Sequence, residues 1–77
     1  MARLIKEIAQ EIREKWTKVS PYAEPYLEAM MELNTIDDYY YLDTAESVVL
    51  YFLCNATTFR GEDARRLKKE LRDLIHD

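Results

Sequence analysis

Apolar residues recur every three or four positions along most of this chain, a spacing typical of amphipathic helices. The first such stripe extends from Leu4 to Val19, and the polar positions between carry opposite charges four residues apart, such as Arg3 and Glu7. Pairs of this kind stabilise a helix locally. We therefore expect a first helix at about residues 2–18, which Pro21 brings to an end.

Two further stripes predict helices in the second quarter and at the end of the chain. Pro25 fits the first turn of a helix, so the second helix is expected at about residues 24–33. The single glycine, Gly61, is followed by two acidic residues, which favour the positive end of a helix dipole. The apolar stripe after them predicts a last helix at about residues 62–75.

The segment 48–54 is apolar without interruption, so its pattern alone does not distinguish a buried strand from a buried helix. Asp43 and Glu46 form a capping-box pattern just before it, and no other segment supplies a strand to pair with it. We therefore expect a third helix at about residues 44–56, apolar on nearly all sides and central in the fold. Cys54 is then expected to lie in the core, where a thiol is unreactive.

Thr35 and Asp38 resemble another capping box, which indicates a short helical turn at about residues 36–41. Together these elements predict an all-α fold, a small three- to four-helix bundle, in a single domain over residues 1–77. One glycine and two prolines are too few for the turns of a small β-sandwich or barrel, which agrees with this fold class.

The composition also restricts the setting and the chemistry. A single cysteine allows no internal disulfide and no thiolate cluster for zinc, so we expect a cytoplasmic protein. The longest apolar run is far shorter than the roughly 18 residues that span a bilayer, so no membrane partner is expected. One glycine also excludes the familiar phosphate-binding loops.

Candidate catalytic residues are scarce. The single histidine, His76, is next to last, and a catalytic histidine needs a second group to hold it. The carboxylates between residues 37 and 46 lack the glycine and the spacing of a calcium loop. We therefore expect no enzyme activity, no metal and no cofactor.

Charge is distributed unevenly along the chain. Residues 19–59 contain seven acidic residues and neither lysine nor arginine, although the whole chain has a net charge of only -4. Glu24, Glu28 and Glu32 are four apart and should form one ridge of like charge on the second helix. Two interpretations remain open: the basic terminal helices neutralise this ridge within the fold, or it meets a basic surface of a partner.

Three consecutive tyrosines favour the second interpretation, because successive helical side chains point about 100° apart and cannot all face one core. Phe59 lies outside every stripe, so it is either a plug at one end of the bundle or an exposed anchor. The candidate protein interface comprises Glu24, Glu28, Glu32, Asp37, Asp38, Tyr39, Tyr40, Tyr41, Asp43, Glu46, Phe59 and Arg60.

A different surface would be used if the partner were nucleic acid. Its candidate face consists of the cations in and before the last helix, namely Arg60, Arg65, Arg66, Lys68, Lys69 and Arg72. Acidic residues are interleaved with these cations, so the segment is nearly neutral and is also typical of a solvated helix face.

The stretches PYAEPYLEAM, at 21–30, and DTAESVVLYFLCNATTFRGEDARRLKKEL, at 43–71, resemble small proteins of bacteriophages and other bacterial mobile elements. The resemblance implies a protein of the bacterial cytoplasm that binds and blocks a host factor. We therefore expect a stoichiometric protein-binding inhibitor of the anti-CRISPR or anti-restriction type. A homodimer is compatible with this expectation. The alternatives are a small nucleic-acid-binding regulator and a virion structural or assembly protein.

Overall fold

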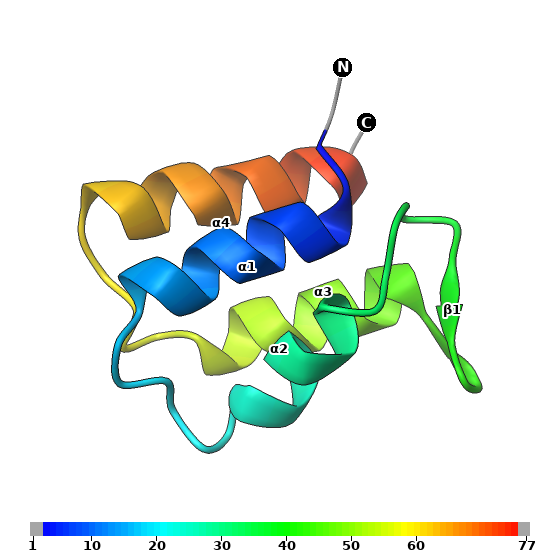
Figure 1. The fold of residues 1–77 in the computed structure, drawn as a ribbon, viewed down its shortest axis with the longest axis horizontal. Coiled ribbons are helices and arrows are strands. Elements are labelled where there is room, and N and C mark those ends of the chain that lie inside the picture. Colours follow the sequence, from blue (N-terminus) through cyan, green and yellow to red (C-terminus); the bar gives the residue numbers. More distant parts are fainter. Residues whose placement is uncertain (1–2, 76–77) are drawn as a thin grey trace.

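The computed structural model describes residues 3–75, and the four helices that the apolar stripes predict are all present (Figure 1). A minimal hairpin of two short strands lies between the second and the third helix. The elements in chain order are α1 (Ile5–Lys15), α2 (Glu24–Met30), β1 (Tyr39–Tyr40), β2 (Asp43–Thr44), α3 (Ala45–Asn55) and α4 (Glu62–Ile75). The last helix has the predicted bounds, and no helix within residues 3–75 is both long and apolar enough to span a membrane.

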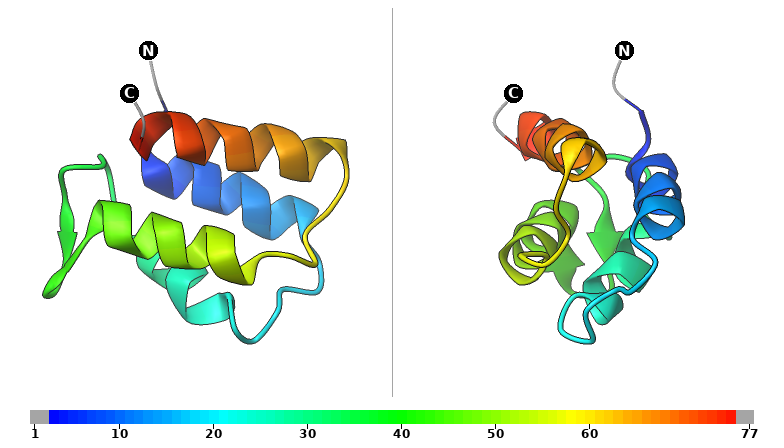
Figure 2. Two further views of the ribbon diagram at one scale, coloured as in Figure 1. Left: turned by 180° about the vertical axis from the view of Figure 1, so that it is seen from behind. Right: turned by 90° about the vertical axis from the view of Figure 1, so that its left-hand side faces the viewer.

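The helices pack in two layers. Helices α1 and α4 form one layer, and α2 and α3 form the other, as the end-on view in Figure 2 shows. The first and last helices of the chain therefore lie side by side, and the middle of the chain forms the opposite layer. The predicted all-α bundle is confirmed.

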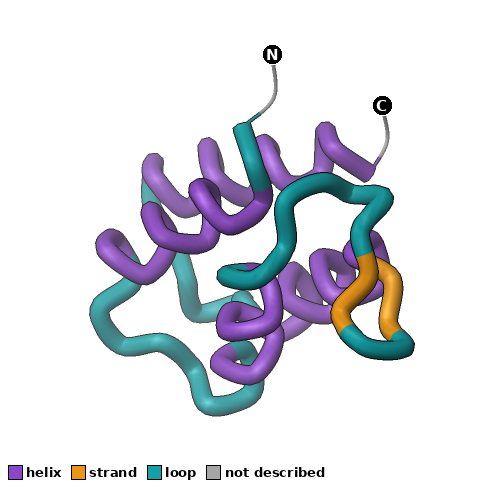
Figure 3. Tube along the Cα trace, turned by 45° about the vertical axis from the view of Figure 1, so that its right-hand side comes forward, coloured by secondary structure: helices purple, strands orange, loops and turns teal. Residues whose placement is uncertain are grey.

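A β-hairpin replaces the helical turn that we expected at 36–41 (Figure 3). Tyr39 pairs with Thr44 and Tyr40 pairs with Asp43 in an antiparallel register, which leaves a loop of two residues between the strands. The Asp38 carboxylate does accept hydrogen bonds from the backbone N–H groups of residues 34 and 35, at 2.9 and 3.1 Å, the second of which is the reverse bond of a capping box. The expected helix was wrong because these bonds, with the bond from the N–H of Asp38 to the carbonyl of Thr35, close only a single tight turn before the strand.

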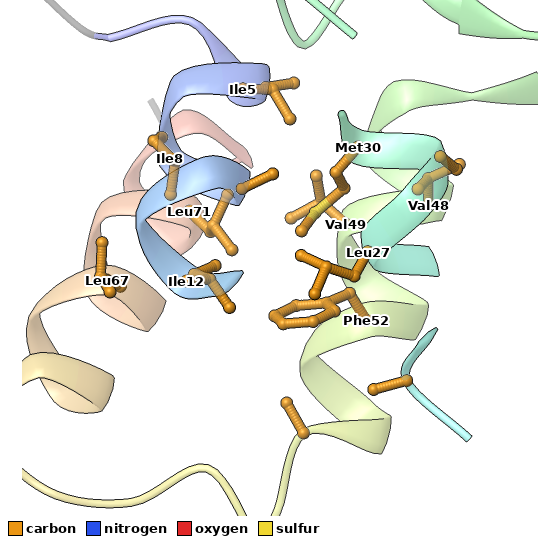
Figure 4. Packing of buried hydrophobic residues seen from close by; sticks show 14 of the residues in the cluster. Ile5, Ile8, Ile12, Leu27, Met30, Val48, Val49, Phe52, Leu67 and Leu71 are labelled. Atoms are coloured by element: carbon orange, nitrogen blue, oxygen red, sulfur yellow. The ribbon is translucent and has the colours of Figure 1, made fainter. Parts of the chain in front are cut away.

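The hydrophobic core lies between the two layers, where the apolar stripes of all four helices meet (Figure 4). Ile12 and Leu71 point into this space from one layer, and Leu27 and Phe52 point into it from the other. All four side chains are fully buried. The 3.6-residue period places the apolar residues of each helix on one face, and this face packs against the core.

Helix α1 ends three residues earlier than predicted, at Lys15. The backbone of Trp16 leaves the helix with φ -102° and ψ 89°, which turns the indole inward. The ring stacks on Phe59 with a centroid distance of 5.0 Å and meets Phe52 edge-on at 6.2 Å. Burial of these aromatic rings outweighs one more turn of helix. Ala2, at the predicted start, lies outside the described residues, as does His76.

Helix α2 also ends early, at Met30 instead of residue 33. The chain that follows turns its carbonyl groups toward the start of α1, where the N–H groups of a helix lack partners within the helix. The N–H of Ile5 donates to the carbonyl of Asn34, and the N–H of Lys6 donates to that of Leu33, both at 2.9 Å. The segment that follows the shortened α2 therefore caps α1 and joins the two layers.

Helix α3 is buried on one side only, which corrects the expectation that it is enclosed. Its cap is Thr44, whose side chain accepts a hydrogen bond from the N–H of Ser47, and not Asp43. Cys54 is exposed together with Leu50 and Tyr51. The reason is the position of α3 at a corner of the bundle: α2 and the core cover its inner side, and no element of the described chain covers its outer side.

Candidate protein-interaction surface

The charges of the α1 and α4 layer largely neutralise one another. Arg3 donates two hydrogen bonds to Glu70, at 2.7 and 2.8 Å, and also forms an ion pair with Glu11 at 2.9 Å. Glu11 accepts a second hydrogen bond from Arg66. The Arg66 guanidinium, followed by that of Arg3, lowers the pKa of the Glu11 carboxyl, whereas Glu70 and Glu11 raise the pKa of Arg3. This ion-pair network uses Arg66, one of the cations of the candidate nucleic-acid face.

The six cations of the candidate nucleic-acid face are not brought together on one free surface. Arg66 is held by Glu11, and Lys69 pairs with Asp73 at 2.9 Å. Arg60, Arg65 and Arg72 are exposed, and none forms an ion pair within residues 3–75.

Lys68 has a structural role. Its ammonium donates hydrogen bonds to the carbonyls of Ala56 and Phe59, both at 2.7 Å, just after α3 ends. Burial, and then the nearby charges of Arg72 and Arg60, lower the pKa of Lys68. Lys68 therefore closes the end of α3, where free carbonyls favour a cation.

The acidic ridge of α2 divides into a paired and an unpaired part. Glu24 accepts a hydrogen bond from Arg13 at 2.7 Å, so the terminal helices neutralise one member, as the first of the two interpretations predicts. Glu28 and Glu32 are exposed and form no ion pair within the described chain. They lie near Tyr40, whose pKa is raised by burial and then by the charges of Glu32, Tyr41 and Glu28.

The remaining acidic residues surround the hairpin. Asp38 belongs to the fold, because its carboxylate accepts the two backbone N–H bonds of the turn, and these bonds lower its pKa. Asp37, Asp43 and Glu46 are exposed, and the structure of residues 3–75 gives them no ion pair. Three carboxylates are thus free to face a partner.

The tip of the hairpin carries the most exposed large hydrophobic side chains of the described chain. Tyr41 is 84% exposed and Leu42 is 98% exposed. Tyr39 is also exposed, whereas Tyr40 is half-buried and meets Tyr41 edge-on at 4.7 Å. Sequence reasoning identified the tyrosines but missed Leu42, although its position outside every helical stripe was a usable signal.

A groove of about 540 Å³ lies between α2, the hairpin and α3. The rings of Tyr26 and Tyr51 stack there with their centroids 5.6 Å apart and their planes 26° apart. The sequence predicted helices at both tyrosines but gave no sign that the two rings meet, so the groove was missed. Its lining residues are Pro25, Tyr26, Ala29, Tyr40, Asp43, Val48 and Tyr51.

Of the two roles considered for Phe59, a plug at one end of the bundle or an exposed anchor, the structure shows the plug. Its side chain is buried and stacks on Trp16. It is therefore not an exposed anchor, and the candidate interface loses this residue. Arg60 beside it is exposed, and its side chain donates to the carbonyl of Thr57 at 3.3 Å.

Compared with known proteins, the chain matches no family model, no curated protein and no solved structure.

Proposed function

We propose that this protein acts by binding another protein stoichiometrically through its hairpin face. This face consists of the hairpin tip and the free carboxylates beside it, namely Tyr39, Tyr41, Leu42, Asp37, Asp43 and Glu46. The observation that carries the proposal is the hairpin tip, where two large side chains stand in solvent on a strained loop.

The fold gains little from these two side chains. Two-residue hairpin loops favour glycine, asparagine or aspartate, because the backbone takes positive φ values there. Tyr41 has φ 56°, which costs a residue with a β-carbon about 1 kcal/mol relative to glycine. Leu42 leaves nearly its whole side chain in water. Exposed aromatic and aliphatic groups on a rigid loop suit an anchor that inserts into a pocket of a partner.

The surrounding charge indicates what kind of partner fits. Asp37, Asp43 and Glu46 flank the hairpin without internal cations, so a partner with a basic rim would be attracted and oriented. The resemblance to phage and mobile-element proteins supports a host factor as the partner, and host defence machinery of the CRISPR or restriction type is the first class to test. The protein would inhibit by occupying a basic site, with no reaction of its own.

Affinity capture with variants of the hairpin tip tests this proposal. The double variant Tyr41→Gly and Leu42→Asn places glycine at the one loop position with positive φ and a turn-forming residue after it, so its melting temperature should stay equal or rise. Capture of the partner from a lysate of the host bacterium should be lost. Tyr22→Asn is the matched control, because Tyr22 is exposed but lies outside the hairpin face. Unchanged capture by the double variant would contradict the proposal.

A further inference from the structure

We propose that the groove between α2, the hairpin and α3 binds an arginine side chain of the protein partner. This inference rests on the proposed function and names the chemical group that the partner inserts beside the hairpin tip. It follows from the chemistry of the groove lining and from the charge around it.

The lining combines an apolar surface with hydrogen-bond acceptors and lacks any cation. Three tyrosine rings, those of Tyr26, Tyr40 and Tyr51, supply π-faces and hydroxyl oxygens, and Asp43 supplies a carboxylate. The other lining residues are a proline, an alanine and a valine. A long aliphatic stem ending in a cation matches this pattern, because the stem packs on apolar groups while the cation meets rings and carboxylate.

A neighbouring groove on this surface is lined by an arginine of the chain itself. That groove shares Tyr40 and is lined by Glu24, Glu28 and Glu32 together with Arg13. Arg13 forms an ion pair there with Glu24. In the groove between α2, the hairpin and α3, which Tyr40 also lines, the carboxylate of Asp43 forms no ion pair within the described residues. This groove therefore offers tyrosine rings and a carboxylate without a cation from the chain itself.

Arginine fits this groove better than lysine. The guanidinium is planar and weakly hydrated, so it stacks on aromatic rings and binds a carboxylate through a fork of N–H donors. An ammonium is compact and strongly hydrated, and it loses more by leaving water. Glu28 and Glu32 add negative charge beside Tyr40 and favour either cation over a neutral side chain.

The test uses three short peptides and the isolated protein. The peptides are N-acetyl-Gly-X-Gly-amide with X as arginine, lysine or the neutral isostere citrulline, titrated while the ring signals of the tyrosines are followed by NMR. The arginine peptide should shift the signals of Tyr26, Tyr40 and Tyr51 saturably, with a Kd in the millimolar range. The citrulline peptide should produce no saturable shift, and the lysine peptide should bind more weakly.

Two groove variants and one control variant complete the experiment. Asp43→Asn and Tyr51→Leu should each weaken binding of the arginine peptide about three- to tenfold. Tyr22→Leu removes an exposed tyrosine outside the groove and should leave the Kd unchanged. Unfolding is monitored on the same samples, so a loss of binding with an intact spectrum reports on the groove.

Three results would overturn the inference. Equal shifts with citrulline, or an unchanged Kd in both groove variants, would show that the groove does not select a cation. Equal binding of the lysine peptide would overturn the assignment to arginine. None of these results bears on the hairpin tip, which the capture experiment tests separately, so failure of the groove and failure of the proposed function are distinguishable.

Discussion

The two layers of this protein treat charge in opposite ways. In the layer of α1 and α4, Arg3, Glu11, Arg66 and Glu70 are joined in one network across the two helices. In the layer of α2, the hairpin and α3, acidic residues predominate, and only Glu24 has an ion-pair partner among the described residues. In the first layer, charged side chains pair across the two helices. In the second layer, most acidic side chains have no ion-pair partner among the described residues and can interact with another molecule.

Apolar surface follows the same division. The exposed side chains of α1 and α4 are mostly polar or charged. Apart from Leu4, directly before α1, the exposed large hydrophobic groups lie on the hairpin, on α3 and near the start of α2. Isolated exposed apolar groups are normal, but aromatic and aliphatic groups next to unpaired carboxylates form the composition of an interface centre and its rim. The comparison indicates that one layer supports the fold and the other is available for binding.

The largest expected effect tests whether α3 divides sharply between a core side and a binding side. Phe52→Ala removes a fully buried ring that contacts Trp16, and it should lower the free energy of unfolding by about 3–5 kcal/mol. Tyr51→Ala, at the next position on the exposed side, should cost less than about 1 kcal/mol. Urea unfolding of both variants measures the two values, and similar values would contradict the division.

Much of this fold could be predicted because local signals and packing agree. The acidic first turn after Gly61 and the regular stripe of α4 predicted its bounds, since each signal acts within one helix. The hairpin could not be predicted in the same way. Tyr41 and Leu42 are not turn residues, so the sequence at this loop contains no signal for the structure that forms there.

The exposure of α3 had a different cause. Its apolar run indicates that a helix forms, but which side is covered depends on where α1, α2 and α4 lie. Cys54 was therefore placed in the core wrongly, and the groove beside Tyr51 was missed. The acidic candidates were found because an absence of cations over residues 19–59 is visible without any structure. Their division into paired and unpaired residues required the position of Arg13, which pairs with Glu24.

The second prediction concerns association with the partner. Replacing the free carboxylates by Asp37→Asn, Asp43→Asn and Glu46→Gln together should slow association about tenfold at low salt and remove much of its salt dependence. Asp38 is left unchanged because its carboxylate closes the turn before the hairpin. Stopped-flow association with the captured partner, between 0.05 and about 1 M salt, measures both effects.

The matched control neutralises the unpaired cations at the other end of α3 and along α4. Replacement of Arg60, Arg65 and Arg72 by glutamine changes the same number of charges with the opposite sign. Association should then stay within about twofold of the original rate. The reverse ranking of the two triple variants would favour the nucleic-acid surface over the hairpin face.

The smallest expected effect tests whether the α1 and α4 layer is stabilised by its own charges. Glu11 has a pKa below its ordinary value of 4.5 in the folded protein, because Arg66 and Arg3 bind its charged form. A lowered folded pKa adds stability above the unfolded pKa, and this stability is lost as pH falls through the folded value. Glu11→Gln should therefore lower the free energy of unfolding at pH 7, by about 0.5–1 kcal/mol for a partly exposed pair. The difference between the original protein and the variant should be constant above about pH 6 and shrink below pH 4.5.

Glu14→Gln is the control for this measurement, because Glu14 lies exposed on the same helix and forms no ion pair within the described residues. Its stability should follow that of the original protein at every pH. The contribution of Asp38, whose pKa is also lowered, is present in all three proteins and cancels in the differences. Salt at 1 M should reduce the Glu11 difference, since screening weakens a partly exposed ion pair. A difference that grows as the pH falls would mean that the network does not stabilise this layer, and the contrast between the layers would then rest on packing alone.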